Sequence, residues 1–196
     1  MRQTIQQSYL LKLWYKPFVS MQGLIASGRK DGYSYKQAQC VSLVVAACFG
    51  VIQSLPLISP QSGSNFWLLP LAALFGVAGV YWLAWLLRNF GRWFGAAANL
   101  RDLRTALGLG LMPWTAVFCL LFLFIQSSRQ VESVQGFFPL FFAGFIYGFV
   151  ILLLCLRAVL EVSVVKTFMC IAIAFVVSLF PFTFIMQVLL QYIHWS

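Results

Sequence analysis

Long apolar stretches separated by short polar connections dominate the chain. Five runs without Lys, Arg, Asp or Glu cover residues 40–58, 66–87, 107–125, 137–156 and 168–190. Each run has about the 20 residues that a helix needs to cross the hydrocarbon core of a bilayer. A lone strand would leave backbone groups unpaired in lipid, so such runs must be helical. The pattern therefore predicts an all-α integral membrane protein built as a bundle of five transmembrane helices.

The segment ahead of the first run has a mixed pattern. Leu13 and Trp14 lie on one apolar helical face with Lys12 and Lys16 beside it, and Pro17 is suited to begin a second short helix. An amphipathic helix of this kind either lies in the membrane interface or packs against the end of the bundle. We expect three parts: a cytoplasmic amphipathic segment at 1–39, a five-helix domain at 40–190, and a short external tail at 191–196.

Composition agrees with a membrane location. Hydrophobic residues make up 62% of the 196 residues and charged residues only 9%, and the mean hydropathy is +0.89. A soluble domain carries about 25% charged residues, so this chain lacks the polar surface of a water-soluble fold. The apolar runs also leave no room for a separate soluble catalytic domain.

The charge distribution predicts an orientation. The net charge is +9, and twelve of the thirteen Lys and Arg residues fall in the N-terminal segment and the second and fourth connections, against one in the other connections. Basic loops stay in the cytoplasm, so we expect a cytoplasmic N-terminus and an external C-terminus. The same asymmetry explains the positive charge without nucleic-acid binding, which we do not expect.

Small residues mark the predicted helix contacts. Gly144 and Gly148 form a GxxxG motif in the fourth run, and Gly76 and Gly79 belong to a small-residue stripe in the second. Such positions let two helix backbones approach closely. The contact is made either within one bundle or between two copies, so a homo-oligomer stays an alternative. Pro113 is expected to kink the third helix.

No pattern in the chain predicts a catalytic, cofactor or metal site. An ionisable residue at membrane depth is the usual mark of transport or proton relay, and the apolar runs contain none. Gln53 and Gln187 are the only strongly polar residues in them, and the single histidine, His194, is near the C-terminus. The five cysteines show no metal-ligand or redox spacing.

Charged residues at the predicted cytoplasmic face remain as candidates. Arg157 and Glu161 are four residues apart, a spacing that favours an ion pair on a helix, and Asp102 lies between Arg101 and Arg104. These groups form either local ion pairs in solvated loops or a docking surface for a partner or lipid headgroups. The candidate contact residues are Trp14, Lys16, Pro17, Arg92, Arg101, Arg104, Arg157 and Glu161.

Several short motifs resemble one known family. They are LWYKP at 13–17, GRWFG at 91–95, LRDLRTA at 100–106 followed by Pro113, and the stretch 156–168 with Glu161, Ser163 and Lys166. Together they resemble bacterial members of the YIP (Ypt-interacting protein) family over roughly residues 11 to 180. The resemblance implies five crossings with a cytoplasmic N-terminus, which the charge count predicts independently.

The resemblance implies a function only in outline. Eukaryotic members act in ER-to-Golgi traffic with Rab GTPases and carry a DLxGP signature, which this chain lacks, so Rab binding is not implied. Some bacterial members accompany ABC-type exporters that protect the envelope from antimicrobial peptides. By this analogy we expect a non-enzymatic accessory, assembly or scaffold component of a bacterial inner-membrane complex, in contact with lipid and a membrane-protein partner.

Two other functions are alternatives to an accessory role. A small transporter or pore-forming subunit would need a polar path, for which Gln53 and Gln187 are the only support. An intramembrane hydrolase or lipid transferase would need a nucleophile or a metal cluster, and the sequence offers no motif for either.

Overall fold

The computed structural model describes residues 12–30, 33–55, 68–127 and 131–195, and the regular structure within them is helical. After a helical turn at 12–15 the helices are α2 (Pro17–Lys30), α3 (Tyr33–Ser54), α4 (Leu68–Trp93), α5 (Leu100–Gly110), α6 (Met112–Ser127), α7 (Val131–Leu160) and α8 (Val164–Trp195). The all-α fold class is confirmed.

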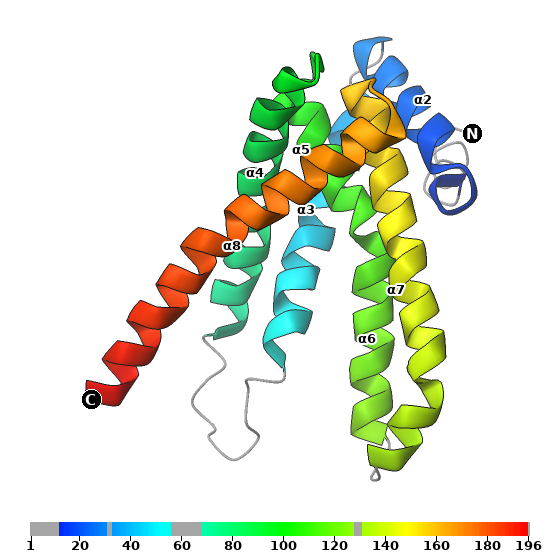
Figure 1. Ribbon diagram of the computed structural model, residues 1–196. Helices are drawn as coiled ribbons and strands as arrows, with labels where there is room; N and C mark the ends of the chain where they lie inside the picture. Colours follow the sequence, from blue (N-terminus) through cyan, green and yellow to red (C-terminus); the bar gives the residue numbers. More distant parts are fainter. Residues whose placement is uncertain (1–11, 31–32, 56–67, 128–130, 196) are drawn as a thin grey trace.

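The helices alternate in direction (Figure 1). Four stretches of the described chain are long and apolar enough to cross a membrane: Tyr35–Ser54, Leu68–Trp93, Leu100–Gln126 and Gly136–Leu160. A shorter apolar stretch, Val164–Phe180, belongs to α8, which continues to Trp195. The described chain thus has four long apolar stretches and a shorter fifth one, which correspond in order to the five predicted runs. Helix α8 crosses the others obliquely (Figure 1).

One end of the bundle collects the basic residues. Helices α3, α5 and α8 begin there and α4 and α7 end there, next to α2 (Figure 1). The ends that meet carry Arg88, Arg92, Arg101, Arg104 and Arg157. We call this end of the molecule the basic end.

The third pass is broken near its middle. Helix α5 ends at Gly110, Leu111 is its C-cap, and α6 begins at Met112. Pro113 has no N–H to donate to a carbonyl one turn earlier, so a regular helix cannot continue unchanged through this point. The sequence predicts a kink at Pro113, and the structure has a break between two helices there. The result is a short α5 at the basic end, in which Thr105 to Gly110 are all buried.

Helices α3 and α4 make backbone contact through two glycines. A Cβ on Gly50 would lie 2.2 Å from the carbonyl oxygen of Ala72, and a Cβ on Gly76 would lie 2.2 Å from that of Ala46. Real side chains never approach a backbone atom so closely, so both positions must lack one. This contact lies within the chain, and it fixes the distance between the first two passes.

The GxxxG motif of α7 faces α6. A Cβ on Gly148 would lie 2.1 Å from the Trp114 ring, and Gly144 lies against Val117. The Trp114 ring also stacks on Phe145 at 4.7 Å, and its Nε1 donates to the Phe145 carbonyl at 2.9 Å. The fourth small residue, Gly79, has no heavy atom within 4 Å of a Cβ built on it. Its predicted packing role therefore has no counterpart within the part of the chain that the structure describes.

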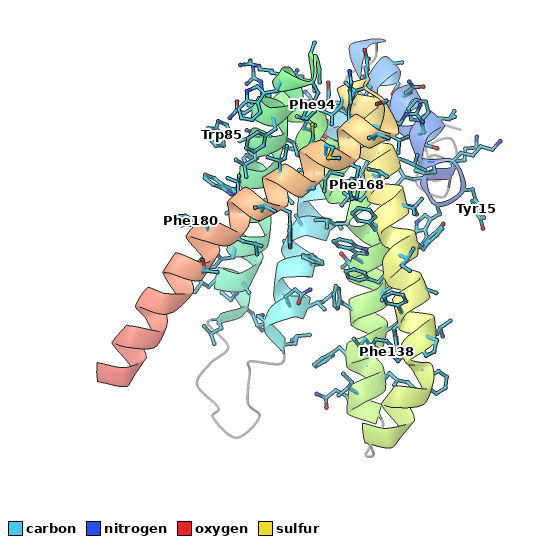
Figure 2. The ribbon with its side chains drawn as sticks, viewed as in Figure 1. Tyr15, Trp85, Phe94, Phe138, Phe168 and Phe180 are labelled. Carbon is cyan, nitrogen blue, oxygen red and sulfur yellow. The ribbon has the colours of Figure 1, made fainter. Side chains whose placement is uncertain are left out.

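The core lies toward the basic end, whereas the rest of the bundle presents apolar side chains outward. Leu87, Leu103, Leu109, Leu156 and Leu160 are among the fully buried side chains. Away from that end the helices spread apart, and aromatic side chains such as Phe138 and Phe180 project outward (Figure 2). An apolar surface of this extent is the one that a bilayer covers.

The N-terminal segment packs against the bundle. Leu13, Met21 and Leu24 are buried, and α2 lies against α7 and α3. Of the two interpretations of this amphipathic segment, packing on the bundle therefore holds for its main apolar face. Tyr15, at 85% exposure, and Val19, at 62%, remain on the outer face and are available to the membrane interface.

Candidate functional site

A pocket of about 400 Å³ opens at the basic end, where four helices and a loop meet. Helix α2 contributes Ile25 and Gly28, α3 contributes Tyr35, the α4–α5 loop contributes Ala97, Ala98 and Asn99, and α5 contributes Arg101 and Asp102. The end of α7 contributes Val159 and Leu160, and Glu161 follows directly after it. The pocket therefore joins segments that are far apart in the sequence, and it includes two of the chain's four acidic residues.

Tyr35 contacts two other helices at the pocket. Its ring is buried against Gly28, where a Cβ would lie only 2.7 Å from the ring, and its hydroxyl donates a hydrogen bond to Asp102 Oδ1. This one side chain thus connects α2, α3 and α5. The hydrogen bond also fixes the direction of the Asp102 carboxylate.

The N-terminus of α5 supports the same carboxylate. Asn99 is the N-cap residue, and its side-chain oxygen accepts a hydrogen bond from the Arg101 N–H at 3.3 Å. Asp102 lies in the first turn, where the partial positive charge of the helix N-terminus stabilises a carboxylate. This local arrangement leaves the Arg101 side chain exposed at the mouth of the pocket.

Glu161 has an unusual backbone conformation. It directly follows the last residue of α7, its φ is +56°, and its N–H donates to the Arg157 carbonyl at 3.0 Å. Helices commonly end with a residue in this left-handed region, but glycine is the usual one, because a side chain there costs about 1 kcal/mol. The chain keeps an exposed glutamate at the pocket, at a conformational cost that glycine would avoid.

The expected ion pairs are not formed. Helix α7 ends one residue before Glu161, which removes the helical geometry that would have placed it beside Arg157. The Arg157 guanidinium lies over the Phe18 ring at 5.0 Å, and that of Arg104 lies over the Tyr81 ring at 4.0 Å. Both arginines therefore use aromatic rings in place of carboxylates, a favourable contact for a cation.

The two pocket carboxylates consequently form no ion pair with the described basic residues. Within the described part of the chain Asp102 bonds to Tyr35, and Glu161 forms no ion pair. Of the two alternatives for these charged groups, local ion pairs are therefore not found among the described residues, because Arg104 and Arg157 contact aromatic rings of other helices.

The other candidate contact residues lie outside the pocket. The Trp14 carbonyl accepts a hydrogen bond from the Tyr147 hydroxyl, Lys16 is exposed, and Pro17 is buried at the start of α2. Arg92 is exposed in the last turn of α4. The structure thus brings Arg101 and Glu161 together in one pocket. Arg92, Arg104 and Arg157 lie elsewhere at the basic end, and Trp14 lies beside Tyr147, thirteen residues before the end of α7.

Sequence reasoning missed several residues of the pocket. Tyr35 and Gly28 gave no motif, because their roles come from tertiary contacts between α2, α3 and α5. Asn99 could have been found, since an asparagine just before a helical apolar pattern is a common N-cap signal. Among the described residues no three His, Cys, Asp or Glu side chains gather as metal ligands would. The side chains of Gln187 and His194 lie outside the described residues.

The four long apolar stretches, the shorter one in α8 and the outward-facing aromatic side chains define an integral membrane protein of the all-α class. A family model described as the Yip1 domain matches residues 24–185, which is most of the chain. The protein therefore belongs to the Yip1 family. No curated protein and no solved structure shows a significant match to the chain.

Proposed function

We propose that this protein is a non-enzymatic accessory or assembly component of a membrane complex and that it binds its partner at the pocket of the basic end. The leading partner is an ABC-type exporter of the bacterial inner membrane that acts in envelope or antimicrobial-peptide defence. The observation that carries the proposal is the set of charges at this pocket. Arg101, Asp102 and Glu161 line it, and none of them forms an ion pair within the described chain.

Unpaired charges of both signs suit recognition of a protein surface. A basic side chain of the partner would form an ion pair with Glu161, and an acidic side chain would form one with Arg101. Complementary charges at an interface set the orientation of the two proteins and disfavour other partners. The positive φ of Glu161 adds support, because strained backbone in a native structure is often retained for function.

The location of the pocket also fits an exporter. The positive-inside rule predicts that the basic end faces the cytoplasm. The nucleotide-binding subunits of ABC-type exporters lie on that side of the membrane. A protein docked through this pocket would therefore contact the part of an exporter that hydrolyses ATP.

Co-purification of the tagged full-length chain from its own membranes tests this proposal. We expect an exporter subunit in the eluate of the native protein, and its loss from Arg101→Glu and Glu161→Lys. Lys36→Glu is the matched control, because Lys36 is exposed near the start of α3 and does not line the pocket. Retention of the partner by both pocket variants would contradict the proposal.

Reconstitution distinguishes this function from a transporter or pore. The purified protein alone in liposomes should give no more ion or solute flux than empty vesicles. Flux that is abolished by Gln53→Ala would overturn the accessory function and favour the transporter. Gln53 is exposed near the end of α3 opposite the basic end.

A further inference from the structure

A second concave surface lies on the outer face of α4. Leu74, Val77, Ala78, Tyr81, Trp82 and Trp85 line an open groove of about 750 Å³ whose walls are almost entirely apolar. The rings of Trp82 and Trp85 stack at 5.5 Å, and Trp85 is on the outer side of the bundle (Figure 2). This groove shares no lining residue with the proposed docking pocket.

A cation lies beside the groove, over the ring of Tyr81, which is closer to the basic end than Leu74, Val77 and Ala78 are. The Arg104 guanidinium of α5 is 4.0 Å from the centroid of the Tyr81 ring. Its Nε is buried without a hydrogen-bond partner, and no acidic side chain of the described chain pairs with it. Arg88 follows Trp85 by three residues and so shares its helix face. A half-buried guanidinium with no anionic partner among the described residues is suited to an anion from outside.

The length of the groove indicates its occupant. Leu74 and Trp85 are eleven residues apart, which is about 16 Å at a rise of about 1.5 Å per residue. One leaflet is half of a hydrocarbon core of about 30 Å. A lipid chain spans one leaflet, whereas a partner helix would need a surface across both. Tyr and Trp are enriched at headgroup depth, and here they lie beside the arginine.

We infer that this groove binds a phospholipid with an anionic headgroup. The acyl chain lies along Leu74, Val77 and Ala78, and the headgroup phosphate interacts with Arg104 and Arg88. This inference is independent of the proposed partner, because it requires no other protein. A charge contact of this kind at a membrane surface favours an anionic lipid by about fivefold per basic residue.

The test compares two lipid headgroups on the same protein. The full chain is reconstituted in phosphatidylcholine vesicles with spin-labelled phosphatidylglycerol or spin-labelled phosphatidylcholine, and the protein-bound fraction of each is measured. We expect phosphatidylglycerol to be preferred, Arg104→Gln to reduce the preference about fivefold, and Lys36→Gln to retain it. Equal preference in native protein and Arg104→Gln, or an equal loss in Lys36→Gln, would overturn the inference.

A second variant keeps the test decisive if Arg104→Gln does not fold. Ala78 is exposed in the groove, so Ala78→Trp fills the groove without entering the core. Ala78→Trp should lose the preference while its helical circular dichroism stays native, and a retained preference would contradict the inference. A photoreactive residue at position 78 should yield lipid adducts. Adducts with a second copy or with another protein would assign the groove to a protein contact.

Discussion

The Tyr35 hydroxyl donates a hydrogen bond to the Asp102 carboxylate, joining the first residues of α3 to the first turn of α5. The two residues are 67 positions apart, so no local pattern could place them together. Because the Tyr35 ring also rests on Gly28 of α2, this pair sets the position of three helices around the pocket. The relative positions of the other pocket residues on α2, α3 and α5 therefore depend on the Tyr35–Asp102 pair.

Removing the Tyr35 hydroxyl should weaken this junction. Tyr35→Phe keeps the packed ring but leaves the half-buried carboxylate with one hydrogen bond fewer, at a cost of about 1–3 kcal/mol. Reversible unfolding in mixed detergent, followed by circular dichroism, measures the change. Tyr15→Phe is the matched control, because Tyr15 is 85% exposed, and it should leave the free energy of unfolding unchanged. Equal stability of the two variants would contradict a structural role for this hydrogen bond.

The glycine contact between α3 and α4 provides a second prediction. Gly76→Ala places a methyl group 2.2 Å from the Ala46 carbonyl oxygen, so the two helices must separate. We expect a loss of about 1–3 kcal/mol, as for other overpacked contacts. Gly79→Ala is the control on the same helix, since a Cβ there meets nothing within 4 Å.

Unfolding in detergent again measures both glycine variants. Gly79→Ala should be neutral or slightly stabilising, because alanine is the better helix former. If Gly79→Ala instead disrupts an oligomer seen for the native chain, then Gly79 contacts a second copy. A Gly76→Ala variant as stable as native protein would contradict the close approach of α3 and α4.

Glu161 allows stability and function to be separated. Glu161→Gly relieves the left-handed backbone, so it should raise the free energy of unfolding by about 1 kcal/mol while it abolishes partner binding. Glu161→Gln removes the charge and keeps the strained side chain, so it should lose the partner without gaining stability. Unfolding and co-purification are measured on both variants. Full partner binding by Glu161→Gly would show that the glutamate is not retained for docking.

Orientation in the membrane is tested by reporter fusions. A protein that fluoresces only in the cytoplasm should be bright when fused after Arg92 or Arg157, because both lie at the basic end. The same reporter should be dark after Ser196, because α8 ends at Trp195, away from the basic end. A bright C-terminal fusion would contradict the predicted orientation of the five passes.

The sequence predicted the passes better than the contacts between them. Uninterrupted apolar runs specify helices because lipid leaves the backbone no other way to satisfy its hydrogen bonds. The exact residue at which a helix ends could not be predicted from the apolar runs. The composition of the pocket depends on that residue in α7. Since α7 ends at Leu160, Glu161 turns into the pocket and the pair predicted from its spacing to Arg157 does not form. The aromatic partners of Arg104 and Arg157 likewise come from other helices.

The candidate site was predicted only in part. Arg101 and Glu161 were chosen as charged residues of polar connections, and the structure places both at one pocket. Tyr35 could not be chosen in this way, because it looks like one more aromatic residue at the start of an apolar run. Its role depends on its contacts with Gly28 and Asp102, which only the folded chain brings together.

Photo-crosslinking in living cells tests the central claim, docking of a membrane partner at the pocket, most directly. A photoreactive amino acid replaces Ala97, which is exposed and lines the pocket, and the adducts are identified by mass spectrometry. We predict an adduct with an exporter subunit that disappears when Arg101→Glu is added and persists with Lys36→Glu. An adduct that survives Arg101→Glu, or one formed only with lipid or with the chain itself, would contradict docking of a partner at this pocket.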